Sequence, residues 1–267
     1  MSRPLLLRII PVALRTPFYY RFYRSNRLQN KAIFENADLY FAPTVKMSLN
    51  PKDEGHGCIA FTGFYELSLS RRISYLAKFG GLFVDIGANY GYFSLLWAAQ
   101  RPENRVVAFE ASPRNHFFLD NNVKRNYFSD SIELHKEAVG KENCFMKFDL
   151  GPENQTSWGG IVLSQSGSQV TKVPVVRLDE MLASDVFVDV LKIDIEGADF
   201  WALIGAEGLL KSKRIGRIFY EENIPRMKSL GINPSDAKNF LLSYGYKVEQ
   251  IEGGPNSAVA EFEAYPA

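Results

Sequence analysis

The sequence predicts an α/β fold with a mostly parallel sheet, an N-terminal extension and an antiparallel strand from a C-terminal hairpin. From Gly81 onward, short and continuously apolar runs alternate with stretches of helical periodicity. This alternation is typical of a parallel sheet that helices cover on both faces. The C-terminal end differs, because two alternating runs flank the turn sequence GGPNS, which is typical of a hairpin.

The individual elements of this α/β region follow from the same patterns. We expect strands in LFVDIG, RVVAFE, IELHKEAV, VDVLKID and RIFYEEN, helices through Ser94–Gln100, Asn115–Asn126, Ala198–Leu210 and Ser235–Tyr244, and a hairpin from YKVEQIE and AVAEFEAY. A polar, glycine-rich insertion over about 145–176 contains GPENQTSWGG and SQSGSQ. We expect it to form a loop or hairpin near the mouth of the binding crevice.

The N-terminal extension is less regular. Its short strand-like runs are Leu39–Phe41, Val45–Leu49 and Ile59–Phe61, with proline and glycine residues between them. A helix is predicted over Tyr65–Phe79 from the spacing of its apolar residues. The predicted division is therefore an extension over 1–80 and a larger domain over 81–267.

Composition excludes several classes of protein. The chain has 267 residues, of which 46% are hydrophobic and 23% charged, with a net charge of +1. These values are typical of a globular protein and do not favour nucleic acid as a partner. The two cysteines form no metal motif, so a reducing cytoplasm is the expected location. No apolar run is long enough to span a bilayer.

The strongest motif is Val84-Asp85-Ile86-Gly87-Ala88-Asn89-Tyr90-Gly91, which follows an apolar strand and leads into a helix. Gly87 permits a tight turn, and Gly91 allows a ligand to approach the start of the helix. The DxGxxxG spacing fits S-adenosylmethionine (SAM) better than a dinucleotide, whose pyrophosphate favours GxGxxG. Asp85 lies where the cationic methionine end of SAM would be received.

The second strand also ends in a candidate ligand-binding residue. RVVAFE places Glu110 at the carboxyl end of a strand beside the first. A carboxylate in this position can accept both hydrogen bonds of a ribose diol. This feature predicts a nucleoside site, but SAM and dinucleotides share it.

Several motifs in order resemble one family. VDIGANYGYFS, AFEASPRN, EAVG, VPVVRLDEML and LKIDIEGAD are similar to the FkbM-type methyltransferases, over about Gly63 to Glu222. One departure is AFEASP, since the family more often has proline directly after the glutamate. The resemblance implies a class I, Rossmann-like methyltransferase with a seven-stranded sheet. It also implies SAM-dependent O-methylation of a saccharide, a glycolipid or a secondary metabolite.

The resemblance also implies the cofactor-binding residues. These are Glu66, Asp85, Gly87, Ala88, Asn89, Gly91, Glu110, Ala111, Ala138, Val139 and Asp194. The backbone around Ala138 and Val139 would lie beside the adenine.

Acidic residues at two further strand ends are the catalytic candidates. Asp194, Glu196 and Glu221 should approach the crevice, where one carboxylate could accept a proton from the acceptor. A Mg²⁺ site made of Asp194 with Glu221 or Glu222 and Asn223 is a second interpretation. A third is that these acids form salt bridges with basic residues, for which the candidates are Lys192, Arg217 and Arg226.

Some alternatives stay open at this point. The rival functions are an NAD-dependent oxidoreductase, which DxGxxxG disfavours, and a non-catalytic, membrane-associated binding protein that retains the pocket. His116 is expected on a half-solvated helix and His135 in packing, so His56 in the EGHG turn is the one histidine to test as a base. Trp158 in the insertion either contacts the substrate or anchors the loop.

The basic N-terminus has two interpretations. Residues 1–31 carry seven basic residues, no acidic one and many aromatic and aliphatic side chains. Such a segment either contacts the inner face of an anionic membrane peripherally or forms an ordinary docked helix. The membrane interpretation favours a lipid-linked glycan over a small-molecule acceptor.

Overall fold

The computed structural model describes residues 3–164, 169–254 and 257–267. Its centre is a seven-stranded sheet of order β12-β13-β11-β10-β3-β4-β5. The strands are β3 (Leu82–Ile86), β4 (Arg105–Phe109), β5 (Ile132–His135), β10 (Val188–Ile193), β11 (Ile215–Asn223), β12 (Tyr246–Glu252) and β13 (Val259–Pro266). All neighbours pair in parallel except β13, which is antiparallel to β11 and β12. The predicted sheet and C-terminal hairpin are therefore confirmed.

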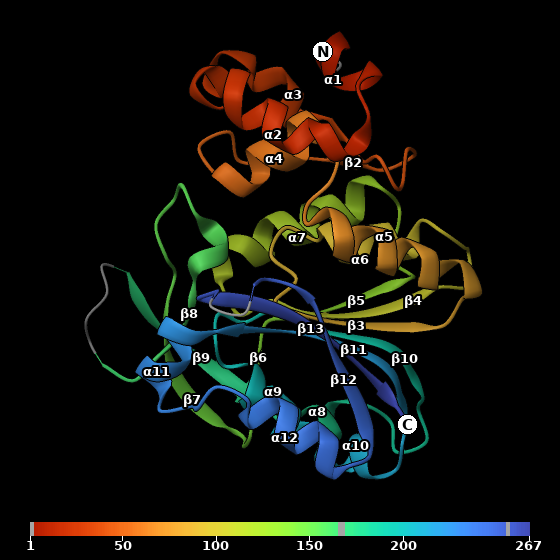
Figure 1. Ribbon diagram of the computed structural model, residues 1–267, viewed down its shortest axis with the longest axis vertical. Coiled ribbons are helices and arrows are strands. Elements are labelled where there is room, and N and C mark those ends of the chain that lie inside the picture. The colour runs from red at the N-terminus through yellow and green to blue at the C-terminus, as the bar shows by residue number, and fades with distance from the viewer. Residues whose placement is uncertain (1–2, 165–168, 255–256) are drawn as a thin grey trace.

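Helices cover both faces of this sheet (Figure 1). One face carries α5 (Leu67–Leu76), the turn η2 (Ala77–Phe79), α6 (Tyr92–Ala98) and α7 (Pro113–Arg125). The other face carries α8 (Leu178–Met181), α9 (Asp199–Gly205), α10 (Glu207–Lys211) and α12 (Asp236–Ser243). Strand residues alternate between the two cores, so Phe83 faces the first and Val84 the second. One short helix, α11 (Ile224–Leu230), follows β11 directly.

The insertion is more ordered than the predicted loop or hairpin. It forms most of a second, four-stranded sheet of order β6-β9-β7-β8, with β6 (Ala138–Val139), β7 (Cys144–Asp149), β8 (Gly160–Val162) and β9 (Val170–Val176). Phe148, Ile161 and Val173 of this sheet pack in a small core that they share with Met227 and Leu230 of α11. IELHKEAV is consequently two strands in different sheets. Residues 165–168, within SQSGSQ, lie outside the described residues.

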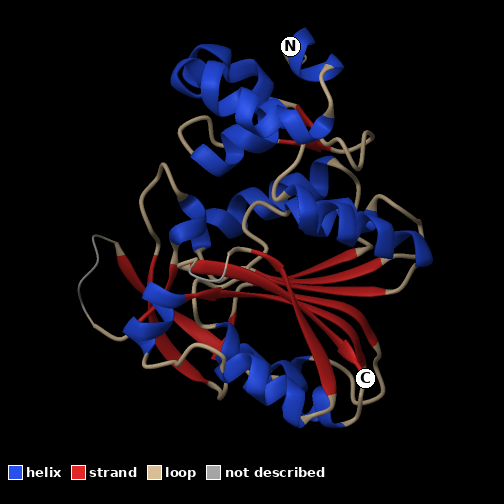
Figure 2. Cartoon of the chain, in the orientation of Figure 1, coloured by secondary structure: helices blue, strands red, loops and turns tan. Residues whose placement is uncertain are grey.

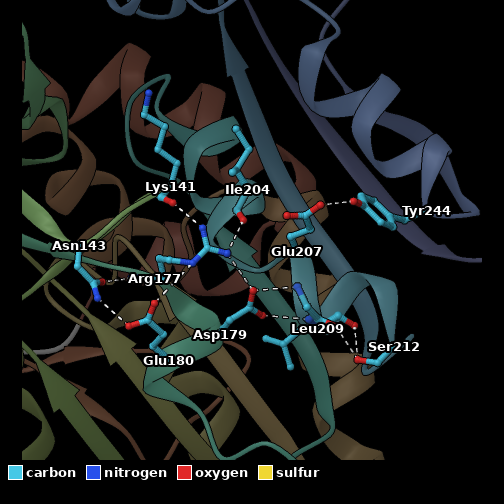
Figure 3. A network of polar contacts seen from close by, with 11 residues as sticks. Lys141, Asn143, Arg177, Asp179, Glu180, Ile204, Glu207, Leu209, Ser212 and Tyr244 are labelled. Carbon is cyan, nitrogen blue, oxygen red and sulfur yellow. Dashed lines mark hydrogen bonds and ion pairs between the residues drawn. The ribbon is translucent and has the colours of Figure 1, made fainter.

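Arg177 ties this second sheet to the main domain (Figure 3). Its guanidinium donates to the carbonyl oxygens of Lys141, at 2.5 Å, and Ile204, at 3.2 Å. Asp179 then accepts from the backbone amides of Gly208 and Leu209 at the start of α10. These capping bonds explain why the single helix predicted over 198–210 is two helices, α9 and α10.

The first part of the chain folds into a helical cap, which we define as residues 3–62 and which lies at one end of the molecule (Figures 1 and 2). It contains α1 (Leu5–Ile9), α2 (Val12–Phe22), η1 (Arg24–Asn30), α3 (Lys31–Glu35), β1 (Ala37–Asp38), β2 (Lys46–Met47) and α4 (Glu54–Thr62). The prediction of a strand over Ile59–Phe61 is wrong, because Asp53 caps α4 by accepting from the amide of His56.

The cap and the sheet share one continuous hydrophobic core. Phe61 is fully buried and packs against the rings of Tyr19, Tyr23 and Phe34. A Cβ on Gly57 would lie 2.1 Å from the Tyr19 hydroxyl, so only glycine permits this approach of α2 to α4. Because the same core continues to Phe83 of β3, the cap is held firmly on the α/β domain.

Candidate functional site

The main cavity lies at the carboxyl ends of β3, β4 and β10, where an α/β sheet offers its ligand crevice. Its floor includes 86–90, 109–111 and 138–139. Thr156, Ser157 and Gly159–Ile161 of the insertion form another wall, and residues of the cap complete it. Of the predicted cofactor-binding residues, the lining includes Gly87, Ala88, Asn89, Glu110, Ala111, Ala138, Val139 and Asp194.

The loop after β3 is fixed against its neighbours. The amides of Gly87 and Ala88 both donate to the Phe109 carbonyl, at 2.9 and 3.0 Å. Gly87 has a φ of 83°, and a Cβ there would lie 2.0 Å from the Asp194 carbonyl oxygen. Only glycine therefore lets the ends of β3 and β10 come this close at the floor of the cavity.

Glu110 holds the loop through its carboxylate. One oxygen accepts from the Asn89 amide and the other from the Ser112 amide, both at 2.8 Å. Burial raises the pKa of Glu110 to about 7. Each carboxylate oxygen has a second lone pair, so Glu110 can still accept hydrogen bonds from a ligand in the cavity.

Three predicted cofactor-binding residues lie outside the lining of the main cavity. Asp85 is buried beneath it and accepts a hydrogen bond of 2.6 Å from the Ser94 hydroxyl. Gly91, with a φ of 90°, begins α6, and a Cβ there would meet Leu119. Glu66 lines a smaller second cavity on the other side of Asp194.

Lys192 lies at the junction of the two cavities and lines both. It is 2% exposed, and its Nζ is 3.1 Å from Asp194 Oδ2 and 3.9 Å from Asp85 Oδ1. Burial alone would lower the pKa of Lys192. The surrounding carboxylates raise it by more, so the net shift of the pKa is upward. The sequence predicted Lys192 only as a salt-bridge partner, whereas strand alternation puts it between two acids on one sheet face.

The second cavity is rich in carboxyl groups. Alternation along β10, β11 and β13 places Asp194, Glu221 and Glu261 on the face that also meets Glu66. Glu221 and Glu261 are opposite each other in the antiparallel pair. Burial, followed by the neighbouring carboxylates, raises the pKa of Glu221 to about 10 and that of Glu66 well above its usual range. Glu221 is therefore protonated at neutral pH and can donate a hydrogen bond, and the same causes favour the protonated form of Glu66.

The residues predicted for a Mg²⁺ site have different surroundings, because Asp194 and Glu221 line the second cavity whereas Glu222 and Asn223 bond elsewhere. Glu222 accepts from the Ser235 amide, and Asn223 caps α11 by accepting from the Arg226 amide. Within residues 3–164, 169–254 and 257–267, no group of three or more acidic, histidine or cysteine side chains is arranged to hold a metal ion. Physically, successive residues of β11 point to opposite faces, so Glu221 and Glu222 are separated by the sheet.

Glu196 faces away from the second cavity. Its carboxylate accepts from Asn223 Nδ2 at 3.1 Å and forms an ion pair with Arg226 Nε at 3.7 Å. Burial raises the pKa of Glu196 to about 7. The predicted salt bridges of the strand-end acids with Lys192 and Arg226 are thus present, while Arg217 pairs instead with Glu263.

A buried carboxylate in the cap, Asp53, contacts the insertion beside the main cavity. Asp53 Oδ2 accepts from the Thr156 amide, at 2.6 Å, and from its hydroxyl, at 2.9 Å. Asn115 of α7 donates to the Thr156 carbonyl at 3.1 Å, and its own Oδ1 has no hydrogen-bond partner in the described part of the chain. Neither Asp53 nor Asn115 stood out in the sequence, because no motif marks contacts between distant segments.

His56 belongs to α4 rather than to a glycine-rich turn. Its Nδ1 accepts from the Asn50 amide at 3.2 Å, so Nε2 carries the proton and donates to Asn89 Oδ1 at 3.3 Å. Burial lowers the pKa of His56, which favours this neutral form. Both ring nitrogens are engaged, so His56 positions Asn89 and has no free nitrogen to act as a base.

The other residues singled out in the sequence have structural contacts. His116 is buried at 8% exposure rather than half solvated, because α7 packs closely on the sheet. His135 stacks on Phe109, in agreement with packing. Trp158, in the turn η3 (Thr156–Trp158), is half exposed, and its carbonyl accepts from Arg226 at 2.6 Å.

The sheet order and the crevice at its carboxyl ends define a class I methyltransferase fold. The model of the methyltransferase FkbM domain family matches residues 85–248, more than half of the chain. The chain therefore belongs to this family, as its motifs predicted.

Similar proteins include one curated relative and several solved structures. "Methyltransferase 1" of Beauveria bassiana (strain ARSEF 2860) is 25% identical over 144 residues, which is 46% of this chain and 57% of that protein. The chain thus spans less than two thirds of this relative.

Two solved structures resemble the fold at low identity. The human methyltransferase 10 domain containing protein has a TM-score of 0.47 and 9% identity, over 92% of this chain and 97% of that chain. A putative tRNA (m1A22) methyltransferase from Streptococcus pneumoniae, in complex with S-adenosyl-L-methionine, has a TM-score of 0.43 and 15% identity, over 74% and 72%.

Proposed function

We propose that this protein is a SAM-dependent methyltransferase that methylates a hydroxyl oxygen of a saccharide, a glycolipid or a secondary metabolite. The observation that carries this proposal is the position of Asp194, which lines both the main and the second cavity. One carboxylate is thereby in reach of a cofactor on one side and an acceptor on the other. Membership of the FkbM methyltransferase family supports the reaction class.

The main cavity suits SAM in both shape and chemistry. Gly87 keeps the end of β3 open, and Glu110 offers oxygen acceptors for the ribose hydroxyls. The unpartnered Oδ1 of Asn115, within the described residues, suits a ligand with N–H donors such as adenine. We assign Ala111, Ala138 and Val139 to the adenine walls.

We assign the second cavity to the methyl acceptor. A hydroxyl group both donates and accepts hydrogen bonds, so its site needs partners of both kinds. Protonated Glu221 supplies a donor, burial favours the same protonated form in Glu66, and Asp194 beside Lys192 supplies an acceptor. Leu69, Phe219 and Ile251 give the cavity apolar walls, against which the carbon face of a sugar or polyketide can pack.

SAM supplies an electrophilic methyl group bound to a positively charged sulfur. As the acceptor oxygen bonds to the methyl carbon, the methyl–sulfur bond would break and release a neutral thioether, while Asp194 would accept the hydroxyl proton. Lys192 lies beside this carboxylate and forms an ion pair with it, with Nζ 3.1 Å from Asp194 Oδ2. In this proposal Glu221 binds the acceptor. Glu196 does not contact the acceptor and instead holds Asn223 and Arg226 in place.

The test is methyl transfer from labelled SAM to a panel of saccharide, glycolipid and polyketide-type alcohols. Asp194→Asn should lower kcat by about 10²–10⁴-fold, the usual contribution of a general base, while the Kd of SAM stays within about threefold. Glu133→Gln is a matched control, because Glu133 is an exposed acid on β5. Full activity of Asp194→Asn would contradict the role of this carboxylate.

A further inference from the structure

The outer end of the cap exposes large apolar side chains. The exposed fractions are 70% for Leu5, 69% for Ile9, 55% for Leu14, 53% for Phe22 and 41% for Leu6. Figure 1 shows that α1 and α2 form the end of the molecule that is far from the sheet. So many apolar side chains close together on a surface indicate a binding surface.

These side chains are held outward by a rigid scaffold. Leu7 and Tyr19 are fully buried and anchor α1 and α2. Helical spacing of 100° per residue puts Leu14, Pro17 and Arg21 on the side of α2 opposite to buried Arg15 and Tyr19. The exposed apolar groups therefore do not result from a loose terminus.

The charged residues of α1 and α2 are all basic. Residues 1–34 contain no acidic residue. Arg3 and Arg15 point inward and donate to backbone carbonyls of Asp38 and Thr62, and Arg24 pairs with Glu54. The exposed cations that stay on the outer surface are Arg8, Arg21 and Lys31.

We propose that this surface, formed by residues 5–31, binds peripherally to an anionic lipid bilayer. Leucine, isoleucine and phenylalanine side chains enter the interface, while the arginines contact the lipid phosphates. In the described part of the chain, no helix is long and apolar enough to cross a membrane. The contact is therefore at the surface.

Charge argues for a bilayer rather than for a second copy of this chain. In a symmetric dimer the same patch meets itself, so the arginines of one copy would lie against the basic patch of the other. Like charges brought together in a desolvated interface oppose association. Anionic lipid phosphates neutralise the same charges.

The test is co-sedimentation of the full chain with phosphatidylcholine vesicles, with and without phosphatidylserine. We expect binding only with phosphatidylserine, and weaker binding at about 0.5 M than at about 0.1 M salt. Ile9→Asp with Leu14→Asp should abolish it, and Arg8→Gln with Arg21→Gln should weaken it at least about tenfold. Tyr75→Asp with Phe79→Asp is the matched control, since both residues are exposed on the α/β domain.

Vesicle co-sedimentation measures membrane binding independently of methyl transfer. Thermal unfolding and SAM titration check that each variant is folded. Equal sedimentation of wild type and the Ile9/Leu14 variant, or binding that ignores phosphatidylserine, would overturn the proposal. So would a concentration-dependent dimer, seen by light scattering, that the same substitutions dissociate.

Discussion

The helical cap and the family-matching region, residues 85–248, contribute to the same cavity in different ways. The family region supplies the floor, built from strand ends that a sequence motif identifies. The cap supplies Asp53, which no motif identifies, and His56, which the sequence singled out only as a base, and these residues hold the insertion and the loop after β3 in place. The difference teaches that the boundary of a family match is not the boundary of a functional site.

The largest expected effect tests whether the cap is an integral part of the fold. Phe61→Ala should lower the free energy of unfolding by about 3–5 kcal/mol, as for other buried aromatic residues. All three tryptophans lie outside the cap, so their fluorescence during urea unfolding reports on the α/β domain. Exposed Leu28→Ala is the control. A tryptophan midpoint that Phe61→Ala leaves unchanged would mean that the cap folds separately.

A smaller effect is expected where the cap meets the insertion. Asp53→Ala removes the carboxylate that accepts hydrogen bonds from the His56 amide and from the amide and hydroxyl of Thr156. It should therefore destabilise the protein by about 2–3 kcal/mol. Calorimetry should also show SAM affinity at least about tenfold weaker. Lys52→Ala, at an exposed ion pair between the same segments, should change neither. Unaltered SAM affinity in folded Asp53→Ala would show that the cap does not contribute to the SAM site.

His56 tests the same comparison at the level of one side chain. His56→Phe keeps a ring against Tyr90 but loses both hydrogen bonds, so SAM affinity should fall about three- to tenfold. Because burial lowers the pKa of His56, the unfolded chain takes up a proton that the folded protein does not. Wild-type stability should therefore fall as pH drops below about 6.5, and less so in His56→Phe. An identical pH dependence would contradict this assignment.

The acid-rich cavity should show the opposite pH dependence. The folded protein keeps Glu221 protonated up to about pH 10, whereas this group normally titrates near 4.5. The unfolded chain therefore releases the proton first, and stability falls as pH rises through this window. Glu221→Gln should reduce the loss of Tm between about pH 6 and about pH 9. The same loss in variant and wild type would show that Glu221 is ionised.

How far the sequence could predict the molecule depends on the range of the interactions. LFVDIG and RVVAFE predicted their strands because local apolar runs determine them. The strand assigned to Ile59–Phe61 failed, since the capping bond of Asp53 and the aromatic contacts of Phe61 outweigh local propensity. The division at about residue 80 stays a prediction.

The predictions for the site also succeeded where the determinants are local and failed where they are long-range. Gly87 and Glu110 were found from the motif, because a tight turn and a strand-end acid have local signatures. Asn115 and Thr156 were missed, since their hydrogen bond joins segments 41 residues apart. Mg²⁺ coordination finds no support, because only Asp194 and Glu221 share a cavity while Glu222 and Asn223 accept from the Ser235 and Arg226 amides.

The most direct test of the central claim is calorimetric titration of the full chain with SAM and, separately, with NAD⁺. We expect micromolar binding of SAM alone, and its loss in Glu110→Ala, because Glu110 both holds the Asn89 loop and faces the cavity. Binding of NAD⁺, or of neither ligand by a folded protein, would contradict the account and leave an oxidoreductase or a non-catalytic binding protein as the better one.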